Sequence, residues 1–171
     1  QIYGCISPIQ DVDSSFGEQK KFDVFFALDT AADRLGAALP FFEAAGKRIN
    51  IDHHISNAKG CGDVNFVDPD ASSTCELVYR LLGREGLDVE IAKALYMGIA
   101  HDTGCFQYSC TSPDTLRAAA DLISYGFDFS RLIDETFFEK TYLQTQILGR
   151  ALLESIRFMD GRCVVCVLNR K

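Results

Sequence analysis

Hydrophobic and polar residues follow two different periods in the first third of the chain. The run 22–28 (FDVFFAL) is short, aromatic and bounded by charged residues, which predicts a strand. The stretch 35–46 is typical of a helix that ends at Gly46, and 47–51 (KRINI) predicts a second strand. Because strand, helix and strand in this order are typical of a parallel βαβ unit, the sequence predicts an α/β fold.

The next segments predict a short strand followed by helices. Residues 63–69 (DVNFVDP) predict the strand, and Ser73 and Glu76 have the spacing of a capping box that opens a helix over 74–84.

Two further helices follow in the same pattern. Asp88 is placed to cap a helix over 89–104, and Ser112 before Pro113 begins another. The helical period predicts that the buried face of the latter comprises Leu116, Ala119, Ala120 and Ile123.

The end of the chain changes character. From 128 to 156 the pattern stays helical, with a break near 138–141, and 162–168 then predicts a strand. Because a single strand does not make a domain, we expect a second domain that begins here and is cut short.

Composition narrows the class of protein. With 171 residues, 47% of them hydrophobic and 24% charged, the chain is long enough for the core of one domain. No run approaches the roughly 20 apolar residues of a membrane span, and no secretory signal precedes the first strand, so we expect a soluble cytoplasmic protein. A net charge of −7 disfavours non-specific binding to nucleic acid. A phosphate-bearing substrate would therefore need metal ions or a further basic segment.

The cysteines predict thiols and no disulfide framework. There are seven of them, an odd number, scattered through the predicted helices and strands. Cys163 and Cys166 form a CxxC, but positions three apart on a strand point to opposite faces, which favours buried strand residues over a zinc or redox site.

Acidic residues and histidines gather where predicted elements end. Asp29 and Asp52 each follow a strand, so in a parallel sheet they emerge at the same carboxyl edge, where such sheets bind ligands. His53 and His54 follow directly, and Asp102 ends a predicted helix. Three carboxylates and two imidazoles suit Mg²⁺ or Mn²⁺, with imidazole shifting the preference towards Mn²⁺.

Each of these residues also has an ordinary structural explanation. A single aspartate after a strand is more often a turn residue or a helix cap than a ligand, and a single histidine is as often structural as functional. The adjacent pair favours function. His101 precedes Asp102 and fits a capping role as well as a catalytic one, so we treat it as a modifier of the site.

Four segments, ALDTAADRLG, NIDHHISN, DVNFVDPDASSTCELVYRLL and GIAHDTGCFQYSCTSPDTLRAAADLISYGFD, together resemble the DHH phosphoesterase superfamily. The branch they resemble most is that of the nano-RNases and 3′-phosphoadenosine-5′-phosphate (pAp) phosphatases. The resemblance implies a parallel-sheet DHH domain flanked by helices over 1–134, a connecting helix over 135–157, and the start of a truncated DHHA1 domain over 158–171.

The resemblance also implies roles for the site residues. Two Mn²⁺ ions, with Mg²⁺ as the alternative, would be held in part by Asp29, His53 and Asp102. His54 would contact the scissile phosphate, and Asp52 would orient the histidines.

One motif of the family is missing. No H-x-x-P-D-x-D pattern precedes Asp29, and Asp11 and Asp13 lack the histidine and the spacing, so we interpret them as loop residues. We therefore expect this 171-residue chain by itself to be nearly inactive.

The function that this implies is hydrolysis of short oligonucleotides (nanoRNA), of pAp, or of both, by a homodimer. The alternatives are a cyclic-dinucleotide phosphodiesterase, a RecJ-like exonuclease, an inorganic pyrophosphatase, or a DHH module that binds nucleotide without hydrolysing it. A substrate panel separates the enzymes, and the missing motif favours the non-catalytic module.

Overall fold

The computed structural model describes residues 5–6, 11–17, 21–161 and 163–166. The chain divides into two compact units, residues 1–136 and 137–171. Nothing in this division tests the predicted domain boundaries at 134 and 157. No helix in the part of the chain that the structure describes is long and apolar enough to cross a membrane.

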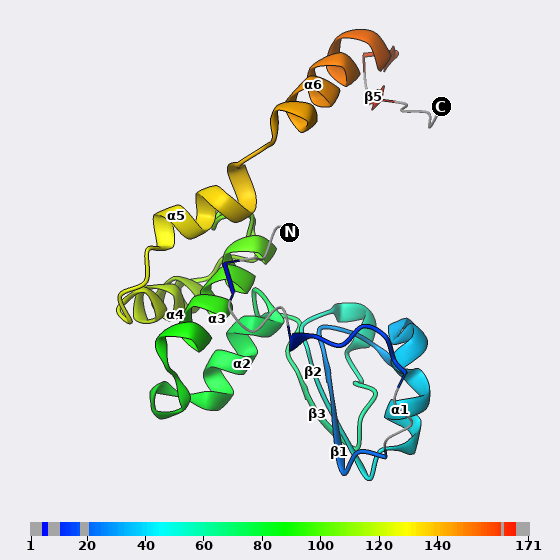
Figure 1. Cartoon of the computed structure of the whole chain (residues 1–171), viewed down its shortest axis with the longest axis vertical. Helices are drawn as coiled ribbons and strands as arrows, with labels where there is room; N and C mark the ends of the chain where they lie inside the picture. Colours follow the sequence, from blue (N-terminus) through cyan, green and yellow to red (C-terminus); the bar gives the residue numbers. More distant parts are fainter. Residues whose placement is uncertain (1–4, 7–10, 18–20, 162, 167–171) are drawn as a thin grey trace. The chain divides into compact units, whose positions relative to one another are not determined.

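A parallel sheet forms one half of the first unit (Figure 1). Its strands are β1 (Val24–Leu28), β2 (Lys47–Asp52) and β3 (Val64–Val67), in the order β1-β2-β3. Both strand pairs are parallel. The predicted α/β fold with a parallel sheet is therefore confirmed.

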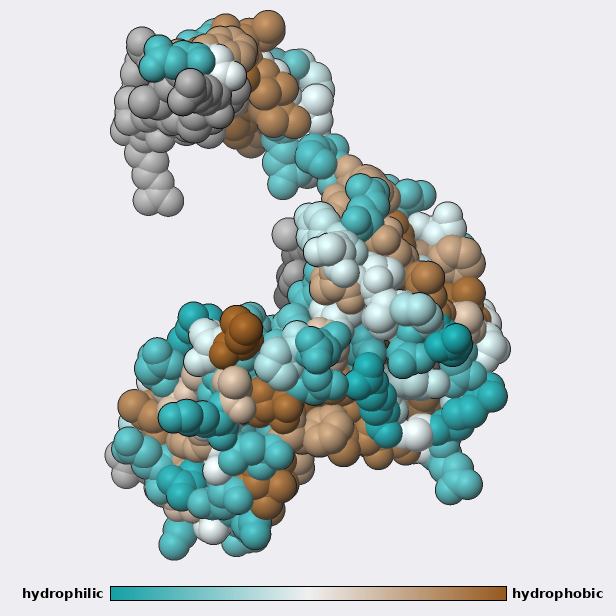
Figure 2. All heavy atoms as spheres, turned by 180° about the vertical axis from the view of Figure 1, so that it is seen from behind, coloured by the Kyte–Doolittle hydropathy of each residue, from teal (hydrophilic) through white to brown (hydrophobic). Residues whose placement is uncertain are grey.

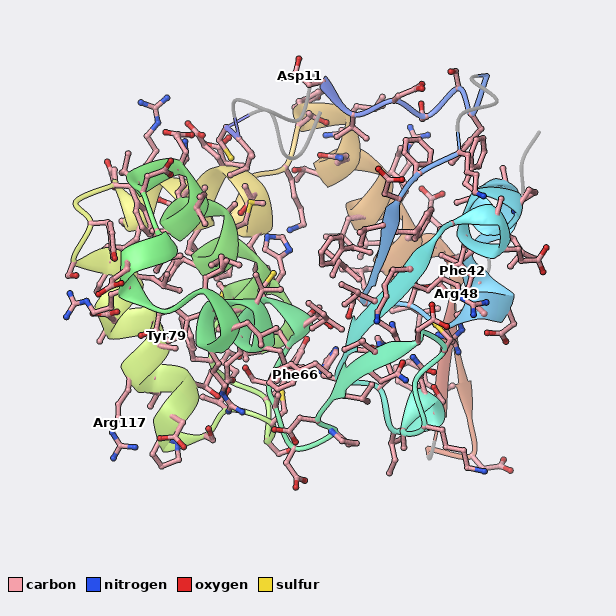
Figure 3. The ribbon with its side chains drawn as sticks, turned by 90° about the horizontal axis from the view of Figure 1, so that it is seen from below. Asp11, Phe42, Arg48, Phe66, Tyr79 and Arg117 are labelled. Atoms are coloured by element: carbon pink, nitrogen blue, oxygen red, sulfur yellow. The ribbon has the colours of Figure 1, made fainter. Side chains whose placement is uncertain are left out.

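One helix, α1 (Leu39–Ala44), lies on one side of this sheet (Figure 1). It is shorter than the predicted helix, and the 3₁₀ turns Ala32–Arg34 and Gly36–Ala38 precede it. Pro40 explains the late start, because proline lacks an amide hydrogen and fits only the first turn of an α-helix. Phe42 is buried, and Figure 3 shows it beside Arg48, whose guanidinium carbon lies 5.6 Å from the ring centre.

The helix α2 (Thr74–Leu82) packs against β2 from the other side. Its fully buried Leu77 contacts Ile51 of β2. Large apolar side chains on this side of the sheet are nevertheless exposed, Phe26 to 56% and Phe66 to 38%. Figure 2 shows, on the face in view, brown apolar side chains among a mostly hydrophilic surface.

Three more helices complete the first unit, α3 (Val89–Asp102), α4 (Pro113–Ile123) and α5 (Phe129–Ile133). The predicted caps form, since the side chain of Asp88 accepts a hydrogen bond from the Ile91 amide and Ser112 makes a capping box with Thr115. Their shared core comprises Ala92, Leu95, Tyr96, Ile99, Ala100, Ala118, Ala119, Leu122 and Leu132.

Two predictions about the helices of the first unit, one for α4 and one for α2, are wrong in part. On α4 the buried face contains Thr115, Ala118, Ala119 and Leu122, whereas Leu116 is 51% exposed. The face is rotated because the Thr115 hydroxyl donates to the buried carboxylate of Glu76. That same carboxylate accepts from Ser72 and does not complete the capping box with Ser73, which caps α2 from one side only.

The second unit contains a helix and a hairpin. A π-helical segment (Asp134–Phe138) spans the boundary between the units and is followed by α6 (Tyr142–Arg150), and the predicted break falls between them. A second π-helical segment (Ala151–Ser155) follows α6.

The strand β4 (Ile156–Met159) corrects the prediction of a helix up to 157. It pairs antiparallel with β5 (Cys163–Cys166) across a turn in which Asp160 and Gly161 have positive φ. An Asp-Gly turn of this kind favours a hairpin, and the pairing outweighs the helical period. The predicted CxxC strand is thus present, and its cysteine side chains lie outside the described residues.

Candidate functional site

Asp29 lies directly after β1, in a conformation that few residues other than glycine and asparagine adopt. Its φ is 59°. Its amide donates to the Ile51 carbonyl at 3.0 Å, and the Thr74 hydroxyl, at the start of α2, donates to its Oδ1 at 2.8 Å. The backbone therefore reverses direction at Asp29, and the two hydrogen bonds hold its carboxylate at the carboxyl edge of the sheet.

Asp52 is the last residue of β2 and is 1% exposed. Its Oδ1 accepts from the amides of His53 and His54, at 2.8 and 3.1 Å, and from His54 Nδ1 at 2.7 Å. Burial alone would raise the pKa of Asp52, but the hydrogen bonds from Asn57 and His54 outweigh it and lower the pKa. A charged carboxylate thus fixes the loop that carries both histidines.

His53 lies between two carboxylates. Its Nε2 is 3.4 Å from Asp29 Oδ1 and 3.8 Å from Asp102 Oδ2. On the other side of the ring, Nδ1 lies 3.4 Å from the carbonyl oxygen of Ala71. A carbonyl only accepts, so a proton on Nδ1 can be donated to Ala71, and the Nε2 lone pair is then available for a cation between the carboxylates.

His54 completes the group. Its Nδ1 lies 3.7 Å from Asp29 Oδ1 while bonded to Asp52. Asp29, His53 and His54 each offer a ligand atom within 4.8 Å of the others. Because Asp52 accepts the Nδ1 proton, Nε2 is the nitrogen of His54 that remains for a ligand.

The pKa of Asp102, the last residue of α3, is shifted by burial and by the charges of this group. Burial raises its pKa, the charge of Asp29 raises it further, and the histidines lower it. A cation among these groups would remove the repulsion between the carboxylates. The donor set, two carboxylates and imidazole nitrogens, therefore fits a divalent metal ion.

All the predicted ligands thus meet at one place, and the structure adds three residues that the sequence interpretation missed. Thr74 contacts Asp29, and Asn57 contacts Asp52 and Asn50. Both asparagines stand within the segment RINIDHHISN that carries the histidines, which is the one signal that points to them.

The other polar residues singled out from the sequence do not belong to the ligand group, although His101 lines the same cavity as Asp29 and Asp102. His101 Nε2 is 3.1 Å from the hydroxyl of Thr136, which itself donates to the Leu132 carbonyl and so accepts from the histidine. Asp11 and Asp13 are exposed, and Asp13 accepts a hydrogen bond from the Ser15 amide in a loop.

A cavity of about 460 Å³ adjoins the group. Polar side chains line one part of it and apolar side chains line the rest. The polar ones are Asp29, Thr74, His101 and Asp102.

The sequence of residues 5–99 matches the N-terminal domain of the DHH family. The chain belongs to the DHH family. The match includes Asp29 and the Asp52-His53-His54 triplet and ends before Asp102, so the place of Asp102 in the site rests on its geometry.

Two curated relatives of this DHH chain carry the name "Bifunctional oligoribonuclease and PAP phosphatase NrnA". The protein of Thermus thermophilus is 37% identical over 81% of the chain and 42% of the relative. That of Bacillus subtilis is 36% identical over 70% of the chain and 39% of the relative. The DHH chain thus spans about two fifths of the length of these relatives.

A solved structure has the same fold. The exopolyphosphatase-related protein of Bacteroides fragilis superposes with a TM-score of 0.84, covering 94% of the chain and 50% of that protein. At 22% identity this likeness extends to the fold alone.

Proposed function

We propose that the protein is a metal-dependent phosphoesterase that hydrolyses short oligonucleotides and pAp. The observation that carries the proposal is the meeting of Asp29, His53, His54 and Asp102 at one edge of a parallel sheet. The names of the DHH relatives supply the substrate class.

The residues of the chain divide the work between holding metal and holding phosphate. Asp29, Asp102 and Nε2 of His53 would hold the metal, and Mn²⁺ fits the mixed oxygen and nitrogen donors. A pair of such ions, when bound, supplies an activated water and offsets the charge that develops on the phosphate.

His54 is the candidate for direct contact with the substrate. Nδ1–H of His54 donates to Asp52, so a protonated His54 presents Nε2–H to a phosphate oxygen. Thr74 and the backbone of Ile51 restrain Asp29, so the carboxylate need not reorganise when ligands arrive.

The setting is part of the same proposal. The described cysteines Cys5, Cys61, Cys75, Cys105 and Cys110 are free thiols, which supports a reducing compartment such as the cytoplasm. Assembly as a homodimer is proposed from the family resemblance.

The experiment is product release from pAp and from a dinucleotide by the intact gene product that contains this chain. Mn²⁺ and a chelator are compared, beside Asp102→Asn. Hydrolysis that the chelator and the substitution both abolish supports the proposal. Absence of turnover despite bound Mn²⁺ would favour the non-catalytic module, and turnover limited to cyclic dinucleotides or pyrophosphate would replace the proposed substrates.

A further inference from the structure

Two buried asparagines connect the loop after β1 with the loop after β2. Asn50 is 0% exposed and Asn57 is 8% exposed. Neither is a candidate metal ligand or substrate contact. Because a buried amide stays only where its hydrogen bonds are satisfied, their partners show what the pair does.

Asn50 binds the backbone on both sides of Asp29. Its Nδ2 donates to the carbonyl oxygens of Ala27 and Thr30, at 2.9 and 3.0 Å, which lie on either side of Asp29 in the chain. The backbone between these carbonyls reverses at Asp29, where φ is 59°. A non-glycine residue in this region is held there by its surroundings. The single amide group of Asn50 therefore clamps both ends of the strained reversal.

Asn57 joins this clamp to Asp52. Its Nδ2 donates to Asn50 Oδ1 at 2.9 Å and to Asp52 Oδ2 at 2.7 Å. An amide nitrogen carries two hydrogens, and these are the two shortest of its three contacts, the third being the Thr30 carbonyl oxygen at 3.4 Å. The contacts also fix which way each amide points, because only the nitrogen of Asn50 can face two carbonyls.

The bond from Asn57 to Asp52 also determines how Asp52 contacts His54. With Asp52 Oδ2 occupied by Asn57, Oδ1 receives the bonds from the histidine loop, including His54 Nδ1 at 2.7 Å. Removal of Asn57 would free the carboxylate to rotate and would leave Asn50 Oδ1 with only the Cys61 amide, at 3.2 Å.

We propose that Asn50 and Asn57 are positioning residues that hold Asp29 in its left-handed conformation and His54 in its Nδ1-protonated tautomer. The catalytic importance of this clamp rests on the proposed function. The tautomer and the backbone geometry do not, since both follow from hydrogen bonds among residues of the chain itself.

The first measurement is the ring ¹⁵N spectrum of His54 in the 171-residue chain, at a pH above the ordinary histidine pKa of about 6.5. The wild-type protein should show the Nδ1-protonated tautomer, and Asn57→Ala a mixture of tautomers. The matched control is Asn65→Ala. Asn65, an exposed residue of β3, makes two side-chain hydrogen bonds with Gly62 and contacts no site residue through them.

The second measurement is Mn²⁺ affinity, from the spectrum of free Mn²⁺ during titration. Loss of a residue that orients metal ligands typically weakens binding about 10–100-fold. We expect that loss for Asn50→Ala and Asn57→Ala and none for Asn65→Ala. An unchanged His54 tautomer together with unchanged Mn²⁺ affinity in both variants would overturn the proposal.

A variant that fails to fold is replaced by its serine counterpart, whose hydroxyl retains one donor. If the alanine and serine variants at both positions all fail to fold while Asn65→Ala folds, the pair serves stability and the positioning role is overturned. A wild-type enzyme that shows the tautomer and binds Mn²⁺ but hydrolyses neither pAp nor a dinucleotide would count against the proposed function alone.

Discussion

The Nε2 atom of His53 lies 3.4 Å from Oδ1 of Asp29, although the two residues leave the sheet from different strands. When the ring proton of His53 is on Nδ1, facing the Ala71 carbonyl 3.4 Å away, no hydrogen bond joins Nε2 to Asp29. Two atoms with lone pairs thus face each other at close range. Such an arrangement is unfavourable unless a proton or a metal ion is shared between them.

Asp29→Asn should therefore weaken Mn²⁺ binding at least tenfold. The substitution keeps the shape of the side chain but removes the charge and one strong oxygen ligand. Titration with Mn²⁺ alone measures the effect. Asp33→Asn removes an exposed aspartate of the following turn and should leave the affinity unchanged. Equal affinity of all three proteins would contradict the assignment of Asp29 as a ligand.

The two histidines should separate by their effects. His54→Ala is expected to reduce turnover of the intact protein 10²–10⁴-fold, the usual contribution of general acid–base catalysis, with a smaller loss of Mn²⁺ affinity. His53→Ala should lose metal first, because its Nε2 faces Asp29 and Asp102. The opposite outcome, with metal lost from His54→Ala and retained by His53→Ala, would mean that the two roles are exchanged.

The sequence predicted the meeting of Asp29 and Asp52 because parallel strands end at a common edge, whatever the loops beyond them do. It did not predict Asn57 or Thr74. Their roles depend on where a 3₁₀ turn and a helix start place one side chain, and the sequence contains no periodic signal for that.

The predictions for two elements, the buried face of α4 and the helix up to residue 157, were wrong for a related reason. On α4, alanines give little contrast between faces, so the burial of Thr115 followed from its bond to Glu76 and not from hydrophobic period. At Ile156 the pairing with a later strand decided the structure, although the preceding residues continue a helical pattern. Both are contacts between distant parts of the chain, which local patterns do not contain.

Glu76 should make the stability of the domain depend on pH. Burial would raise its pKa, but hydrogen bonds from Ser72 and Thr115 and the charge of Arg80 prevail, and the pKa lies below 4.5. Since the folded state binds this proton less readily than the unfolded state, the stabilisation is present above pH 4.5 and is lost as the pH falls through the lowered pKa.

Glu76→Gln should lower the free energy of unfolding by roughly 1–3 kcal/mol at neutral pH, because its amide cannot accept all of these bonds. Urea denaturation at several pH values measures the gap to the wild type, which should narrow in acid. Glu43→Gln, at an exposed position of α1, serves as the control. A gap of constant size across the pH range would show that the charge of Glu76 contributes nothing.

The backbone that follows Asp102 is strained at Cys105. Gly104, Cys105 and Phe106 have φ values of 56°, 54° and 67°, one short left-handed turn held by the bond from the Cys105 amide to the Ala100 carbonyl at 2.7 Å. A β-branched residue there should be worse than cysteine and glycine better suited, since the left-handed region costs other residues roughly 1–2 kcal/mol. Cysteine already bears this cost, so its relief in Cys105→Gly should offset the lost side chain and leave the free energy of unfolding nearly unchanged, whereas the second branch at Cβ in Cys105→Val should lower it. Cys110→Val, at an exposed position outside the left-handed turn, should change it by less than about 0.5 kcal/mol. Denaturation curves of the three variants that coincide would mean that the turn carries no strain.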